Sequence, residues 1–208
     1  MDGGVFINYR GQDSHSYGAL LYTELARRFG AERVFLDCES IPAGADFARE
    51  LLGRVRRARV LLAVVGPHWL TAADPAGHRR IDDPSDWVRR ELAEAFAAGV
   101  RVIPVLTDGA DLPAEAELPA DIAALGRCQC RHLRRREPTA SLARIVSDLI
   151  SLDPVLAAAA PGPDPGGAPR GPGSCRRIPR CSPAAPGSSC GCWRWPSRLS
   201  PDARRARW

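Results

Sequence analysis

Val60-Leu61-Leu62-Ala63-Val64-Val65 is the stretch that decides the fold, because six consecutive apolar residues are typical of a β-strand that is buried on both faces. Such strands lie inside parallel sheets, where helices cover both sides. On either side of this stretch, three more short and nearly continuous apolar runs occur at residues 5–7, 34–36 and 102–106. We expect these four runs to pair in parallel within one sheet.

Amphipathic segments separate the apolar runs, and their apolar residues recur at helical spacing. Residues 14–29 predict a helix that ends at Gly30, with an apolar stripe formed by Tyr17, Leu21 and Leu25. A weaker fifth strand is expected at residues 128–133, and further helices at residues 47–57, 87–98 and 139–152. This alternation predicts an α/β fold: a flavodoxin-like, doubly wound, five-stranded parallel sheet with helices on both faces.

The composition changes after residue 152, which divides the chain into a domain of residues 1–152 and a tail of residues 153–208. The tail contains 11 Pro, 7 Gly and 6 Ser, so few of its residues can build a core, and it is predicted to be disordered. The tail carries 9 Arg against 3 Asp, whereas the domain carries 20 Arg against 21 acidic residues. The positive net charge therefore belongs to the tail, which fits a solvated linker better than a nucleic-acid-binding segment. Its scattered Trp, Cys and Arg residues also fit a truncated or frame-shifted gene.

Several classes of partner are not expected. The N-terminus lacks a basic region followed by an apolar stretch, and no aliphatic run is long enough to span a bilayer, so we expect a cytoplasmic protein without a membrane partner. Cys128-Gln-Cys130 and Cys190-Gly-Cys192 are too tightly spaced for the common Cys-x-x-Cys knuckle, and no metal site is predicted. The Arg runs lack interleaved aromatic residues, so nucleic acid is not an expected partner either.

The loops that follow the strands are expected to form the ligand crevice, as in other doubly wound sheets. Trp87 and Glu91 lie four residues apart at the start of a predicted helix, so they share one helical face. An aromatic plane beside a carboxylate can hold a cationic ring and stabilise positive charge on a sugar. The pair suggests chemistry on a nicotinamide nucleotide, in a chain that has no Gly-x-Gly-x-x-Gly or Walker motif.

The first of three informative motifs is VFINYRGQD, at residues 5–13. It resembles the first box of the Toll/interleukin receptor (TIR) domain family, in which a strand usually ends in Ser-Tyr-Arg or Ser-Phe-Arg and plant members continue with Gly-Glu-Asp. This chain departs from that pattern at Asn8 and Gln12.

Two further motifs extend the resemblance to about residues 4–150. VFLD at residues 34–37, followed by the loop with Ile41, Pro42, Ala43 and Gly44, is similar to the family's second strand and the loop after it. Phe47 ends this loop, and it also lies on the apolar stripe of the helix that it begins. DWVRRE at residues 86–91 matches the Trp-x-x-x-Glu pattern in which enzymatic members carry their catalytic glutamate.

The resemblance, in particular to the bacterial NAD-cleaving type, implies an NAD glycohydrolase that releases nicotinamide and ADP-ribose or a cyclic isomer. NAD is then a substrate, and no cofactor is implied. Nicotinamide leaves as a neutral ring, so one carboxylate can suffice without a general acid, in contrast to ordinary glycoside hydrolysis. The resemblance assigns catalysis to Glu91 and substrate binding to Trp87, Arg10, Tyr9, Asp37 and Phe47. It assigns self-association, or pairing with another TIR domain, to the loop with Ile41, Pro42 and Gly44.

Several of these assignments have alternatives. Trp87 also suits a packing role, and Arg10 also suits a surface ion pair with Asp13 or Asp37. Glu91 also suits an exposed position on a helix surface. For the whole chain, the alternative is a non-catalytic TIR–TIR interaction module in signal transduction. In either case the resemblance implies a role in immune or anti-phage signalling.

Overall fold

The computed structural model describes residues 3–36 and 46–159. In this part of the chain, five strands form one parallel sheet in the order β2-β1-β3-β4-β5. The strands are β1 (Val5–Tyr9), β2 (Val34–Leu36), β3 (Val60–Val65), β4 (Arg101–Thr107) and β5 (Arg131–Leu133). This order confirms the predicted flavodoxin-like, doubly wound sheet. The central strand β3 is buried over its whole length, as its run of apolar residues predicts.

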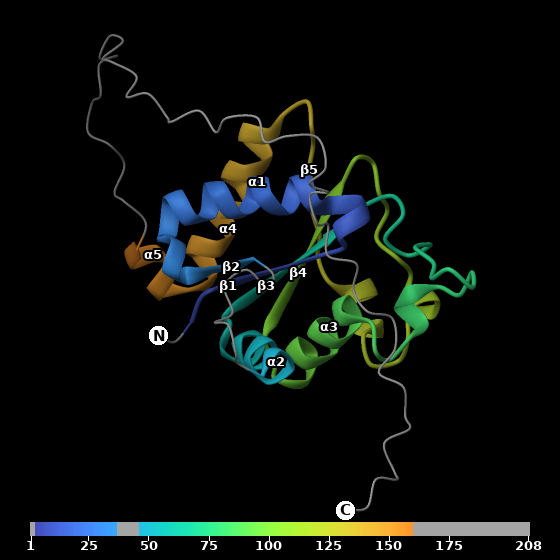
Figure 1. Cartoon of the computed structure of the whole chain (residues 1–208). Coiled ribbons are helices and arrows are strands. Elements are labelled where there is room, and N and C mark those ends of the chain that lie inside the picture. The colour runs from blue at the N-terminus through green and yellow to red at the C-terminus, as the bar shows by residue number, and fades with distance from the viewer. Residues whose placement is uncertain (1–2, 37–45, 160–208) are drawn as a thin grey trace, which may run out of the picture. The chain divides into compact units, whose positions relative to one another are not determined.

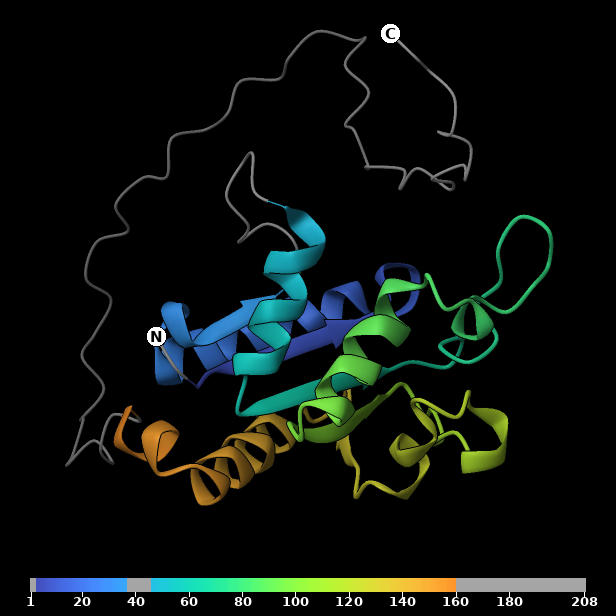
Figure 2. The same cartoon turned by 90° about the horizontal axis from the view of Figure 1, so that it is seen from below.

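Helices cover both faces of the sheet, as Figures 1 and 2 show. One layer contains α1 (Gly11–Phe29), α4 (Pro138–Leu152) and α5 (Pro154–Ala159), and the other contains α2 (Phe47–Arg57) and α3 (Trp87–Ala97). Short 3-10 helices connect these elements: η1 (Ala31–Arg33), η3 (Arg80–Asp82), η4 (Glu115–Glu117) and η5 (Ala123–Arg127). Each layer packs its own apolar core against the sheet.

The residues of β1 alternate between the two layers. Val5 and Ile7 pack with α1 and α4, whereas Phe6 packs with α2 and α3. Because successive strand residues point to opposite faces, Asn8 belongs to the face of α2 and α3, and Tyr9 belongs to the face of α1 and α4. This alternation decides which side chains can meet at the carboxyl end of the sheet.

The helix α3 begins at a capped turn and ends at a glycine. The Asp86 carboxylate accepts a hydrogen bond from the Arg89 backbone N–H at 3.1 Å, as N-cap residues usually do. After the last turn, Gly99 has a φ of 70° and its N–H donates to the Phe96 carbonyl at 3.1 Å. The side chains that bury α3 against the sheet are Val88, Leu92 and Ala95. The helix agrees within one residue with the predicted range of 87–98.

Regular structure continues past the boundary predicted at residue 152. Asp153 is buried, accepts the Val155 N–H at 2.7 Å and forms an ion pair with Arg59 at 3.2 Å. The helix α5 follows directly, and its Leu156 is fully buried in the core beneath α1 and α4. These residues therefore pack as part of the domain.

Some of the predictions fall outside the described residues. They are the disorder of residues 160–208 and the roles of Asp37, Ile41, Pro42 and Gly44. Within the described part of the chain, no helix has the length and apolar character needed to cross a membrane.

Candidate active site

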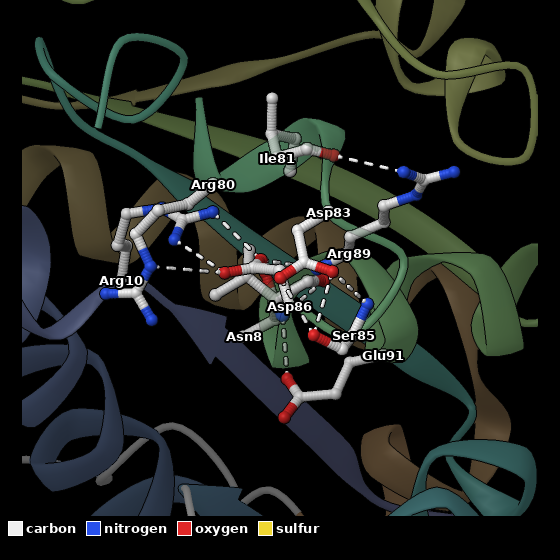
Figure 3. A network of polar contacts seen from close by, with 10 residues as sticks. Asn8, Arg10, Arg80, Ile81, Asp83, Ser85, Asp86, Arg89 and Glu91 are labelled. Carbon is white, nitrogen blue, oxygen red and sulfur yellow. Dashed lines mark hydrogen bonds and ion pairs between the residues drawn. The ribbon is translucent and has the colours of Figure 1, made fainter. Parts of the chain in front are cut away.

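Glu91 is half-buried on α3, and Asn8 at the end of β1 holds its carboxylate (Figure 3). The Asn8 Nδ2 donates a hydrogen bond to the Glu91 Oε2 at 2.7 Å and another to the Val88 carbonyl at 3.2 Å. Asn8 itself is fully buried. Both partners are acceptors, so the amide nitrogen and not the amide oxygen must face α3. The contact therefore fixes one oxygen of Glu91 relative to the sheet.

Arg10 and Asp86 form a second contact between β1 and α3. The two terminal nitrogens of Arg10 donate to the two carboxylate oxygens of Asp86 at 2.9 and 3.0 Å, and both side chains are only 3% exposed. Arg80 lies 3.5 Å from the same carboxylate, and Figure 3 shows both arginines directed at Asp86. Asp86 thus binds two cations while it caps α3. The pair is buried, and it directs Arg10 toward the start of α3.

The two contacts are separated by similar distances along β1 and along α3. Asn8 and Arg10 are two residues apart on β1, which corresponds to about 6.6 Å along a strand. Glu91 and Asp86 are five residues apart on α3, which corresponds to about 7.5 Å along a helix. Asn8 pairs with Glu91 and Arg10 pairs with Asp86, so the start of α3 lies beyond the carboxyl end of β1. Together the contacts define the position of Glu91 at this edge of the sheet.

Trp87 shares the face of α3 with Glu91, and its ring contacts two side chains in the described part of the chain. Its ring meets that of Phe47 edge to face, with centroids 5.2 Å apart and an interplanar angle of 84°. The Arg90 guanidinium lies 4.1 Å from the Trp87 ring centroid. Trp87 and Phe47 also border the apolar core between α2, α3 and the sheet. The structure brings these two predicted residues together, and their contacts favour a packing role.

Tyr9 lies on the other face of the sheet. Its ring packs against the core beneath α1 and lies 5.8 Å from the His15 ring. The family resemblance groups Tyr9 with the substrate-binding residues near Glu91. The structure corrects this grouping, since the alternation of β1 sends Tyr9 away from the face that carries Asn8 and Glu91.

This fold has known counterparts. A family model described as the TIR domain matches residues 5–146. The chain belongs to the TIR domain family. The TIR domains in the structure of the activated Roq1 resistosome, which directly recognises the pathogen effector XopQ, share its fold. That similarity has a TM-score of 0.54 at 14% identity and covers 71% of this chain and 99% of the other.

Two animal proteins are similar to this TIR domain in sequence. The chain is 32% identical over 120 residues to the NAD(+) hydrolase sarm1 of Drosophila melanogaster and 31% identical over 121 residues to the NAD(+) hydrolase tir-1 of Caenorhabditis elegans. Each match covers 57% of this chain, but only 8% of the fly protein and 11% of the worm protein. The TIR domain described here therefore corresponds to a small part of either relative.

No motif assigns a role to Asn8 or Asp86, although they contact Glu91 and Arg10 in this TIR domain. Two signals in the sequence point toward them. Strand alternation puts Asn8 and Arg10 on one face, and aspartate is a preferred residue just before a helix. Neither signal says which helix the strand faces, so the two pairs become visible only in the folded chain.

Tyr17 and Asp108 form another polar contact in this TIR domain, on the face of α1. The Tyr17 hydroxyl donates a hydrogen bond to the carboxylate of Asp108, which follows β4. Burial and this hydrogen bond raise the pKa of Tyr17 to about 12. Tyr17 therefore stays protonated at physiological pH and holds the turn after β4.

A groove of about 490 Å³ runs between β5 and α4. Its lining includes Arg134 and Arg144 together with Arg131 and Asp148, which form an ion pair with each other. Glu91 and its partners are not among the lining residues, so the groove is separate from the candidate active site. Nearby, burial raises the pKa of the Cys128 thiol, which makes this cysteine a weak nucleophile.

Proposed function

We propose that this TIR domain is an NAD glycohydrolase that cleaves the bond between nicotinamide and ribose, with Glu91 as the catalytic carboxylate. The observation that carries the proposal is the placement of Glu91, which Asn8 holds at the carboxyl edge of a doubly wound sheet. Two relatives that are named NAD(+) hydrolases support it. Ligands of such sheets commonly bind at this edge.

The chemistry suits a site with one carboxylate. The electrons of the broken bond pass to the nicotinamide nitrogen and neutralise its positive charge, so the leaving group needs no proton. Positive charge then develops on the ribose, where the Glu91 carboxylate stabilises it. Water adds to the ribose carbon and loses a proton to give ADP-ribose. If a nitrogen or hydroxyl group of the same molecule adds instead, a cyclic isomer forms.

The remaining residues take supporting roles in this proposal. Trp87 and Phe47 form the aromatic wall next to Glu91, and Asp37 is proposed to bind the substrate from the loop after β2. Arg10 holds the start of α3 in place through its two hydrogen bonds to Asp86. NAD is the substrate, and no metal or further cofactor is proposed.

The proposal also includes the self-association of the domain and its cellular setting. We place self-association, or pairing with another TIR domain, in the loop with Ile41, Pro42 and Gly44. The proposed setting is the cytoplasm of a bacterial cell, where cleavage of NAD serves immune or anti-phage signalling. This setting rests on the resemblance of the sequence motifs, since the two named relatives come from animals.

The test is nicotinamide release by the full-length chain, followed by chromatography after incubation with NAD. Glu91→Gln removes the charge with little change in size, and it should lower the rate by about two orders of magnitude or more. Glu94→Gln is the matched control, because Glu94 lies on the same helix but pairs with Arg56 of α2. This control should keep the wild-type rate.

Two outcomes would contradict the proposal. Unchanged nicotinamide release by Glu91→Gln would show that Glu91 takes no part in the reaction. An absence of release by the wild type, even with a crowding agent or forced dimerisation, would favour the non-catalytic TIR–TIR interaction module.

A further inference from the structure

We infer that Asn8 is a positioning residue that orients the Glu91 carboxylate for the reaction. The inference rests on the proposed NAD cleavage and deepens it, because no motif assigns Asn8 a role. The contact that carries it is the hydrogen bond of 2.7 Å from the Asn8 Nδ2 to the Glu91 Oε2.

The strand holds Asn8 rigidly. It is fully buried on β1, and it is paired in register with Ala63 of the central strand β3. Its amide nitrogen has two hydrogens, and both have acceptors on α3, the Glu91 carboxylate and the Val88 carbonyl. Rotation of the amide would lose both bonds and turn its oxygen toward two acceptors. The side chain therefore has one favourable orientation.

A neutral donor suits this position better than a cation. A cation at 2.7 Å would neutralise the charge that Glu91 needs to stabilise a positive ribose, whereas an amide orients the carboxylate and leaves its charge in place. Three arginines lie close to these residues in the sequence. Arg10 is paired with Asp86, Arg89 is paired with Asp121, and Arg90 stacks on Trp87.

The length of the Asn8 side chain also matters. The family's first box usually carries serine at this position. A serine hydroxyl is one bond closer to the backbone than the amide nitrogen of asparagine. It cannot span the same distance from β1 to Glu91 while the backbone stays in place. The contact is therefore a property of this chain that the family pattern does not predict.

A double-mutant cycle on thermal unfolding tests the contact without reference to activity. Asn8→Asp is isosteric but turns an acceptor with a negative charge toward Glu91, and it should lower the Tm by about 4 °C or more. In the Asn8→Asp/Glu91→Gln double variant, the glutamine amide can donate to the aspartate, so the hydrogen bond returns with its direction reversed. The double variant should recover at least half of the loss in Tm.

The same cycle distinguishes the effect of the Glu91 contact on Tm from the effect of the Val88 contact. Asn8→Asp loses its bond to the Val88 carbonyl in both backgrounds, so this loss cancels in the comparison. An equal fall in Tm with and without Glu91→Gln would overturn the inference.

Steady-state kinetics of the full-length chain test the consequence for the reaction. Asn8→Ser should lower kcat by about tenfold to a hundredfold per folded molecule, because misplacement of a catalytic group by about 1 Å has effects of this size. KM should stay within about twofold, since Asn8 is fully buried and acts through Glu91. Thr107→Val is the control, because Thr107 at the end of β4 is also polar and fully buried, but its hydroxyl donates to the carbonyl of Val65 on β3.

The outcomes distinguish this inference from the proposed function. An unchanged kcat in Asn8→Ser, or a raised KM with unchanged kcat, would overturn the positioning role while NAD cleavage stands. If the wild type releases no nicotinamide, the proposed function fails and the catalytic part of the inference fails with it. Recovery of Tm in the double variant would then still establish the Asn8–Glu91 contact.

Discussion

At the scale of single residues, the site depends on how charges are paired. Glu91 receives an amide donor. The nearby cations Arg10, Arg89 and Arg90 are directed to Asp86, Asp121 and Trp87, respectively. The amide of Asn8 therefore fixes one oxygen of the carboxylate at the edge of the sheet. Trp87 shares its helical face, yet ring contacts already use that side chain. The two residues of the Trp-x-x-x-Glu motif thus differ in their contacts, since Trp87 packs against other side chains and Glu91 is held by Asn8.

The ion pair of Asp86 with Arg10 should dominate the stability of this region. Asp86→Asn keeps a good N-cap residue but removes the charge, which leaves a buried arginine without its anion. We expect the free energy of unfolding to fall by about 3–5 kcal/mol, as when one partner of a buried pair is removed. Urea denaturation of the full-length chain measures this loss.

The control for this prediction is Asp46→Asn at the start of α2. Asp46 caps its helix in the same way, by accepting the Arg49 N–H at 3.2 Å, but it is exposed. Its substitution should change stability little. Similar small losses in both variants would show that the cap, and not the buried ion pair, is what Asp86 contributes.

At the scale of elements, α3 combines three functions within three turns. It buries an apolar face against the sheet, it is tied to β1 through its cap, and it carries Glu91. The sequence predicts its range well, because the apolar spacing, the Asp before the first turn and the Gly after the last turn all agree. The contacts with β1 cannot be predicted in the same way, since they join residues about 80 positions apart in the sequence.

Substitution by alanine should change the free energy of unfolding in opposite directions at two glycines, one after α3 and one inside α2. Gly99 ends α3 with a φ of 70°, so Gly99→Ala should destabilise the protein by about 1–2 kcal/mol although no atom lies in the way. Gly53 lies inside α2, where Gly53→Ala should stabilise it by about 0.5–1 kcal/mol. Denaturation midpoints of both variants check the prediction. A loss of stability in Gly53→Ala would indicate a clash with the nearby Arg57 side chain.

At the scale of the whole molecule, the domain extends beyond the change in composition. The proline and small residues after residue 152 favour a prediction of disorder, yet α5 contributes Leu156 to the core. Composition averages over a window, so it does not register one buried leucine in a short helix. The sheet, by contrast, follows from long apolar runs whose burial leaves little choice of fold.

The contribution of α5 can be measured with two neighbouring residues. Leu156→Ala should lower the free energy of unfolding by about 2–5 kcal/mol, because the side chain is fully buried. Val155→Ala should change it by no more than about 0.5 kcal/mol, since Val155 is 37% exposed. Equal effects in urea denaturation would mean that α5 does not stabilise the domain.

The site was harder to predict than the sheet. Glu91 and Trp87 follow from a motif and a helical spacing, and the structure places them on one face of α3. Arg10 and Tyr9 are adjacent in the sequence and seem equivalent there, but strand alternation sends them to opposite faces. A buried partner for Arg10 could not be chosen among the acidic residues without the fold.

The paired contacts between β1 and α3 restrict how α3 can move as a rigid body. One contact near the helix start and another five residues later oppose sliding along the strand as well as rotation about the helix axis. Because β1 pairs with the central strand β3, these contacts fix the position of Glu91 relative to the sheet. The proposed self-association would then add groups around a carboxylate whose position is already set in the single chain.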